Sequence, residues 1–157
     1  MSDTRNGSSV ADLIVGILRQ VLLEYAPQKA TLASSTTDDG VIVIEQSPTS
    51  PQAARIVANV EPDGGLVTLV FGGGSVFEVP SRGRRFTGGP FEDEIRTLCV
   101  AVVQGHFEET IWVKREEVVR AVGRLEVGGR VVRSSWAELF PNIFFRGEKR
   151  VIHYEAY

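Results

Sequence analysis

The stretch of residues 88–105 constrains the fold more than any other part of the sequence. Its apolar residues recur at the spacing of one helical face, at Phe91, Ile95, Leu98, Cys99 and Val102. Pro90 suits the first helical position, and the acidic residues 92–94 favour the positive end of the helix dipole. Gly105 supplies a left-handed stop. These features predict an amphipathic helix over residues 90–104, which needs an apolar sheet to lie on.

A second amphipathic helix is predicted near the N-terminus, from Val10 to Tyr25. Its apolar stripe consists of Val10, Ile14, Ile17, Leu18, Val21 and Tyr25. Ser9 and Asp12 form a pair that resembles a capping box, and Pro27 ends the helix. The chain is therefore expected to contain two main helices.

Strand patterns fill the region between these helices. Four segments are predicted as strands, at residues 41–44, 54–61, 66–71 and 76–79. Residues 62–65 and 72–75 have the glycine-rich composition of tight turns, and short connections favour an antiparallel meander. The polar stretch 29–40 is predicted to be a connection.

Further strand patterns follow the helix at 90–104. Residues 107–113 and 150–154 read as strands, and Gly128-Gly129 is predicted to be a hairpin turn within residues 125–132. Residues 114–124 fit a short helix and a strand equally well. The predicted fold class is α+β, with a mainly antiparallel sheet that combines a meander of four strands with later strands. Two main helices cover it, in a single domain over residues 1–157 whose residues 1–8 are frayed.

The composition is that of an ordinary soluble protein. Of 157 residues, 43% are hydrophobic and 24% are charged, with a net charge of −3. The lone cysteine, Cys99, lies on the apolar face of a predicted helix, which favours a reducing compartment. Asp12 and Arg19 interrupt the first apolar run, so no membrane span is expected. We expect a cytoplasmic protein without a metal site or cofactor.

Three arginines form the first candidate site. Arg82, Arg84 and Arg85 precede the predicted helix at 90–104, and two glycines, Gly88 and Gly89, follow them. Guanidinium and amide groups at a helix N-terminus can bind a phosphate or a carboxylate. The acidic residues 92–94 oppose an anion there, so ion pairs with these carboxylates or simple solvation are the stronger interpretations. The glycines at 72–74 lead into a strand rather than a helix, which favours a hairpin turn over a phosphate loop.

The strand predicted at 107–113 forms the second candidate site. In a regular strand, His106, Glu108, Thr110 and Trp112 would project from one face. A histidine beside a carboxylate is the minimum of an oriented general base, but no activated nucleophile accompanies it. The alternative interpretation places His106 and Glu108 at the surface and leaves Trp112 half-covered by a neighbouring element.

Aromatic residues gather near the C-terminus, at Trp136, Phe140, Phe144, Phe145 and Tyr154. Such a cluster can form an exposed patch that binds a partner, or it can close a second small core against the sheet. Trp136 is therefore kept as a candidate partner-binding residue.

These observations favour a non-catalytic protein-binding module, immunity-, antitoxin- or chaperone-like in style, whose partner is another protein. The alternative is a small-molecule-binding protein or enzyme with a pocket near His106, Glu108 and the loop 82–85. Nucleic-acid binding is the least favoured, because basic residues are mixed with nearly as many acidic ones. Whether the chain forms a homo-oligomer is left open.

Overall fold

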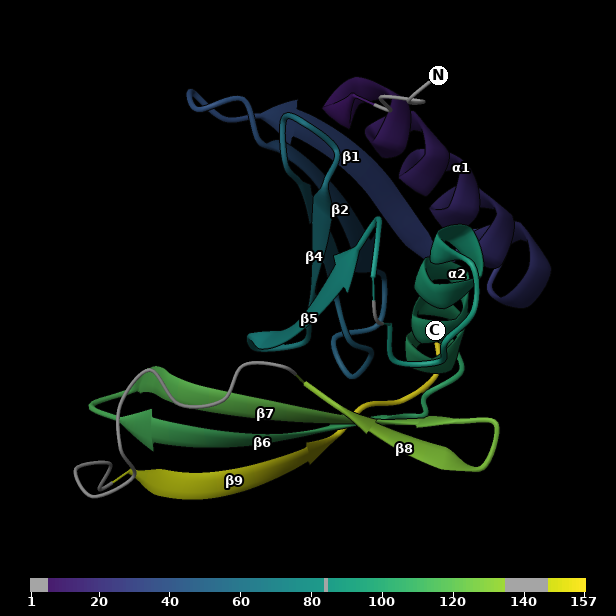
Figure 1. The fold of residues 1–157 in the computed structure, drawn as a ribbon. Coiled ribbons are helices and arrows are strands. Elements are labelled where there is room, and N and C mark those ends of the chain that lie inside the picture. Colours follow the sequence, from purple (N-terminus) through teal and green to yellow (C-terminus); the bar gives the residue numbers. More distant parts are fainter. Residues whose placement is uncertain (1–5, 84, 135–146) are drawn as a thin grey trace.

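The computed structural model describes residues 6–83, 85–134 and 147–157. Two helices and two antiparallel sheets form an α+β fold (Figure 1). The predicted class and the two main helices are confirmed, but the later strands form a second sheet instead of joining the meander. In chain order the elements are α1 (Gly7–Tyr25), β1 (Ala30–Thr36), β2 (Ile42–Pro48), β3 (Ile56–Val60), β4 (Leu66–Phe71), β5 (Ser75–Pro80), α2 (Phe91–Val103), β6 (Phe107–Lys114), β7 (Glu117–Val127), β8 (Arg130–Arg133) and β9 (Glu148–His153).

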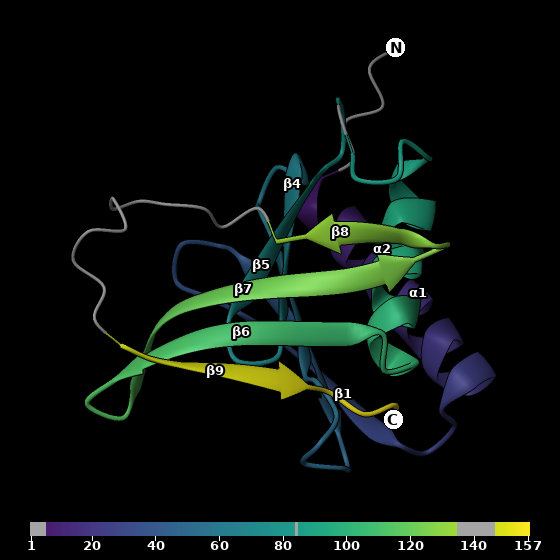
Figure 2. The same cartoon turned by 90° about the horizontal axis from the view of Figure 1, so that it is seen from below.

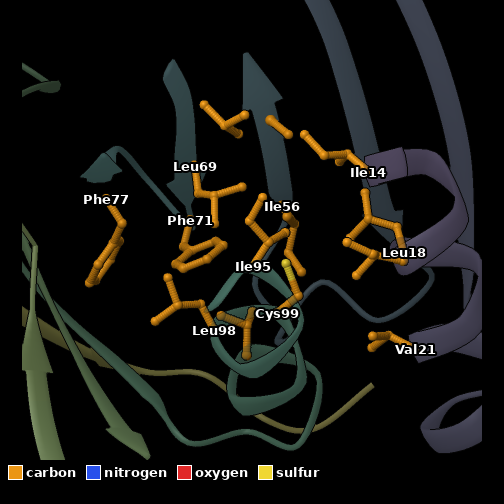
Figure 3. Close-up of a cluster of buried hydrophobic side chains, with 14 of the residues drawn as sticks. Ile14, Leu18, Val21, Ile56, Leu69, Phe71, Phe77, Ile95, Leu98 and Cys99 are labelled. Atoms are coloured by element: carbon orange, nitrogen blue, oxygen red, sulfur yellow. The ribbon is translucent and has the colours of Figure 1, made fainter. Parts of the chain in front are cut away.

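The first sheet is a meander in the order β1-β2-β3-β4-β5, and both helices lie on one of its faces (Figure 1). Side chains alternate along each central strand, so that Ile56, Leu69 and Phe71 point to the helices and are fully buried. Ile14 and Leu18 of α1 and Ile95, Leu98 and Cys99 of α2 meet them in the core (Figure 3). This layer is held together by apolar burial.

Strand β1 was not predicted from the sequence. Residues 29–40 were expected to form a polar connection, but Ala30–Thr36 pairs with β2 along its whole length. The strand lies at the edge of the sheet, and most of its side chains are exposed. It therefore needs few apolar residues, and Leu32 is its one large apolar side chain. The meander therefore has five strands rather than four, and β2 also extends beyond the predicted residue 44 to Pro48.

The helices follow the predicted periodicity. Helix α2 confirms the predicted helix, except that Pro90 is its N-cap, with ψ of 154°, and not its first helical residue. Gly105 has the expected left-handed backbone, with φ of 78°. Helix α1 begins earlier than predicted, at Gly7. Its N-cap is Asn6, whose side chain accepts a hydrogen bond from the Ser9 amide at 2.9 Å, so the predicted Ser9 and Asp12 cap is wrong. No helix in the described part of the chain is long and apolar enough to cross a bilayer.

The second sheet has the order β8-β7-β6-β9 and lies across one end of the first layer (Figures 1 and 2). The ambiguous residues 114–124 belong mainly to strand β7, after a turn at Arg115 and Glu116 with positive φ. The predicted hairpin at Gly128-Gly129 joins β7 to β8. Phe107 and Leu125 point toward the first layer and extend its core.

The last residues of the chain connect the two sheets. After β9, the Glu155 amide donates to the Gln52 carbonyl at 2.9 Å, next to strand β3. The Tyr157 amide donates to Val103 at the end of α2, and its hydroxyl donates to the Ala54 carbonyl at 2.6 Å. The tail thus joins the second sheet, the first sheet and α2.

Candidate functional site

A buried carboxylate, that of Glu109 on β6, lies at the junction of the two sheets. It accepts hydrogen bonds from the Gly73 amide at 2.8 Å and from the Ser75 amide at 3.0 Å. The Ser75 hydroxyl donates to it at 2.6 Å, and the Tyr154 hydroxyl at 2.8 Å. Glu109 and Ser75 are fully buried. A carboxylate with four donors is satisfied inside the protein, so Glu109 joins the β4-β5 turn to the second sheet.

The glycines of the β4-β5 turn allow this close approach. Gly72 has φ of 60°, and a Cβ atom there would lie 2.5 Å from the Tyr154 hydroxyl. A Cβ atom on Gly73 would lie 3.1 Å from a carboxylate oxygen of Glu109. The segment is a hairpin turn, as predicted, and its amides bind a carboxylate of the same chain.

Tyr154 completes this junction from the C-terminal side. Its ring stacks on Phe107 with centroids 5.2 Å apart and an angle of 12° between the planes. Burial, together with the negative charge of Glu109, raises the pKa of the Tyr154 phenol. Tyr154 was grouped with the C-terminal aromatics by sequence, but the structure places it between β6 and the turn. Trp136, Phe140, Phe144 and Phe145 lie outside the described residues.

In the predicted arginine site, the Arg85 side chain binds backbone carbonyls of its own loop. The Arg85 guanidinium donates to the carbonyls of Pro80 at 3.2 Å, Ser81 at 2.6 Å and Gly89 at 3.0 Å. It also lies 5.8 Å from the centre of the Phe91 ring. Arg82 is exposed, and Arg84 lies outside the described residues. Arg85 thus folds the loop that leads into α2.

Among the described residues, Glu94 pairs with neither Arg82 nor Arg85, although one interpretation expected such ion pairs. Its carboxylate is fully buried and accepts hydrogen bonds from the Thr87 amide at 3.0 and 3.1 Å and from the Thr87 hydroxyl. The acidic residue in the first turn of α2 therefore holds the preceding loop from inside the protein.

His106 and Glu108 have different surroundings. His106 is exposed before the start of β6 and lines an open pocket of about 310 Å³ with Tyr25, Arg96, Gln104 and Glu126. Glu108 lies within 2.9 Å of the Nδ1 atom of His153 on β9. A second open hollow is lined by Gly83, Arg85, Gly88 and Gly89, and it shares no residue with the first. The first hollow contains His106 but no described residue of the loop 82–85, and the second contains Gly83 and Arg85 but neither His106 nor Glu108. Neither hollow therefore combines the two regions that the small-molecule hypothesis requires.

The outer face of the second sheet carries the remaining candidates. We use this name for the side chains of three neighbouring strands that point away from the first layer: Glu108, Thr110 and Trp112 of β6, Arg120, Val122 and Arg124 of β7, and Lys149, Val151 and His153 of β9. Thr110 lies between Val122 and Val151, and Trp112 lies between Arg120 and Lys149. Trp112 is half-buried, with the Arg120 guanidinium 4.7 Å from its ring centre.

Alternation along β6 predicted which of its residues share this face, but His153 and Arg120 were missed. Their positions depend on how β7 and β9 are aligned with β6, and the alternation within β6 alone does not fix that alignment.

Other reactive side chains are enclosed or scattered. Cys99 is buried in the core, and burial raises the pKa of its thiol to about 12, so it remains a neutral thiol. In the described residues, no group of three histidine, cysteine or acidic side chains converges as a metal site would require.

Comparison of the sequence with protein-family models and with curated proteins finds no match, and comparison of the fold with solved structures finds none. The function must therefore be inferred from the surfaces of this chain.

Proposed function

We propose that the chain is a non-catalytic protein-binding module, immunity-, antitoxin- or chaperone-like in style, that binds another protein on the outer face of the second sheet. One observation carries this proposal: Trp112 lies on β6, between β7 and β9, on a sheet face that no described element crosses (Figure 2). An antiparallel sheet can leave one face to water, and such a face is normally polar.

The composition of this face supports a protein partner. Tryptophan and arginine are enriched among the residues that dominate binding energy, and Trp112 and Arg120 lie together here. Val122 and Val151 continue the apolar centre, and Val151 is 49% exposed. Charged residues surround this centre, as in the rim of a protein interface.

The proposal is tested by photo-crosslinking from Thr110, which lies at the centre of the outer face between two valines. Asn59 on β3 offers a matched control, because it points outward from the first sheet and is also half-buried. We expect a discrete adduct with one protein from position 110 and none from position 59. The adduct should disappear when Trp112 is replaced by alanine in the same chain.

Two results would count against the proposal. Equal labelling from both positions would indicate random collision, and an adduct that survives Trp112→Ala would show that the tryptophan does not take part.

The alternative function, small-molecule binding, has one observation in its favour. The open pocket beside His106 brings Arg96 and Glu126 to the same hollow. A thermal-shift screen with nucleotides and common metabolites tests it, because a ligand that binds the folded chain raises its melting temperature. Stabilisation that is lost in His106→Ala would favour the pocket over the sheet face as the functional site.

A further inference from the structure

Strand β1 is an unprotected edge of the first sheet. It pairs with β2 on one side, and no described element pairs with its other side. Natural proteins protect such edges with charged residues, prolines, bulges or very short strands. β1 has seven residues, Ala-Thr-Leu-Ala-Ser-Ser-Thr, in an unbroken register with β2, and it carries no charge and no proline. The edge is therefore a template for another strand.

The hydrogen bonds at both ends of β1 show which backbone groups face this edge. The Thr49 amide donates to Lys29 at 2.8 Å, and the Thr37 amide donates to Val41 at 2.9 Å. Because an antiparallel ladder alternates, the odd-numbered residues of β1 bond to β2. The amides and carbonyls of Ala30, Leu32, Ser34 and Thr36 therefore point away from the sheet.

We infer that this edge pairs with β1 of a second copy of the chain, antiparallel, about a two-fold axis through Ala33. In this register residue 30 lies opposite residue 36 of the other copy, and residue 32 lies opposite residue 34. The outward-pointing amides and carbonyls of both copies then meet one another. The dimer contains one continuous sheet with five strands from each copy. No like charges lie opposite each other along β1, because the strand is uncharged.

The ends of the strand make this register self-complementary. Lys29 is exposed just before β1, and Asp38 and Asp39 are exposed just after it. The two-fold axis places Lys29 of each copy beside residues 37 and 38 of the other, so one positive and one negative end meet on both sides. Opposite charges in these places favour the antiparallel dimer centred on Ala33.

An apolar strip borders the same edge. Val15, Leu22 and Leu32 are only partly buried against the core. Glu24 of α1 pairs with Arg96 of α2, and Val15 and Leu22 lie on the opposite side of α1, about 160–180° around the helix. Since α1 packs on β2 and β3 while α2 packs toward β5, that side faces the β1 edge. A second copy covers this strip and removes apolar surface from water.

Disulfide trapping tests both the dimer and its register. At the two-fold axis the Ala33 residues form a pair without backbone hydrogen bonds, with Cα atoms about 4.5 Å apart, which suits a disulfide. Under mild oxidation we expect Ala33→Cys to give a covalent dimer of twice 17.2 kDa. Ser35→Cys is the matched control on the same face, because its two copies lie about 13 Å apart along the strands. The native Cys99 is buried and should not react.

Charge substitution at the axis tests the inference without crosslinking. In sedimentation experiments the wild-type chain should form the dimer by the time its concentration reaches roughly 0.1 mM. Ala33→Lys and Ala33→Glu should each weaken association at least about tenfold, because like charges then lie directly opposite, and mixing the two variants should restore it. Ala33 is exposed, so the melting temperature of dilute protein should not change.

Three results would overturn the inference: a wild-type chain that stays monomeric, equal crosslinking of Ala33→Cys and Ser35→Cys, or a dimer that survives Ala33→Lys. A chain that stays monomeric and binds a strand of another protein at its β1 edge would also overturn the inference. The inference does not rest on the proposed function, because Trp112→Ala should leave the dimer intact while it abolishes partner capture.

Discussion

The two sheets of this protein are held in place by different forces. The first sheet buries an apolar side chain at nearly every inward position of its central strands, and both helices share that contact. The second sheet adds Phe107 and Leu125 to the same core and relies on the Glu109 carboxylate for its contact with the β4-β5 turn. Apolar stabilisation of the first layer is spread over many residues, whereas the polar contact between the second sheet and the β4-β5 turn is concentrated in one carboxylate.

This difference indicates which substitutions should destabilise each sheet most. Loss of one core side chain removes part of a large contact surface, and neighbours can relax around it. Loss of the buried acceptor leaves several donors unsatisfied at once, on both sides of the junction. The second sheet should therefore depend on a few polar groups, and its attachment should respond to changes that leave the first sheet unaffected.

The largest expected effect is that of Glu109→Ala. It orphans the donors of Gly73, Ser75 and Tyr154, each at a cost of about 1–3 kcal/mol, so we expect the free energy of unfolding to fall by roughly 4 kcal/mol. Hydrogen exchange should accelerate in β6 and β9 before it does in β2 and β3.

Glu108→Ala is the matched control for this variant, because the neighbouring carboxylate pairs with a histidine that is 76% exposed. Its cost should stay below about 1 kcal/mol. If the two variants lost equal unfolding free energy, or if hydrogen exchange accelerated evenly in both sheets, the proposed difference between the two sheets would be contradicted.

Gly72→Ala should have the next largest effect, about 2 kcal/mol. The new Cβ atom would lie 2.5 Å from the Tyr154 hydroxyl, and φ of 60° disfavours alanine. Gly128→Ala shares the positive φ, at 54°, but its Cβ atom would meet open space. Chemical denaturation should therefore show a cost of about 1 kcal/mol for Gly128→Ala. If Gly72→Ala were no more destabilised than Gly128→Ala, the β4-β5 turn would not contact Tyr154.

Alkaline pH should weaken the junction through Tyr154. Its pKa is raised by burial in the folded protein, so its contribution is fully present below the unfolded value near 10 and is lost as the pH rises above it. At pH 11 we expect a loss of about 1 kcal/mol from this group.

Tyr154→Phe should make the unfolding free energy less dependent on pH between 9 and 11, and Tyr25→Phe, at a position that is 43% exposed, serves as the control. Tyr157 is partly buried, and desolvation also raises its pKa, so part of the alkaline loss should remain in Tyr154→Phe. An unchanged profile for this variant would show that Tyr154 is not the group responsible.

Trp112→Ala should have the smallest effect on stability, about 1 kcal/mol or less, because its ring lies on the outer face against Arg120 rather than in the core. Thermal unfolding measures this cost, and partner capture should be lost in the same variant. A destabilisation as large as that of Glu109→Ala would show that Trp112 is a core residue and that the outer face is not a docking surface.

Much of the fold could be predicted from local patterns in the sequence. The period of 3.6 residues and the flanking Pro90 and Gly105 predicted α2, and glycine-rich turns between strand patterns predicted the meander. Of the candidate site, alternation along β6 correctly predicted that Glu108, Thr110 and Trp112 share a face. His106 was expected there too, but it precedes β6 and lines the pocket beside α2. These features depend on neighbours within a few residues, which the sequence shows directly.

Contacts between distant residues were decided by the tertiary structure alone. Glu109 meets Ser75 and Tyr154, which are 34 and 45 residues away, and nothing near Glu109 in the sequence indicates either partner. Strand β1 forms because β2 offers a ladder to a segment whose side chains give almost no strand signal. The sequence by itself determined which segments could be helices and strands, because those choices follow from local periodicity. The folded chain decided which charges are buried and which edge stays open, because both depend on how the sheets are brought together.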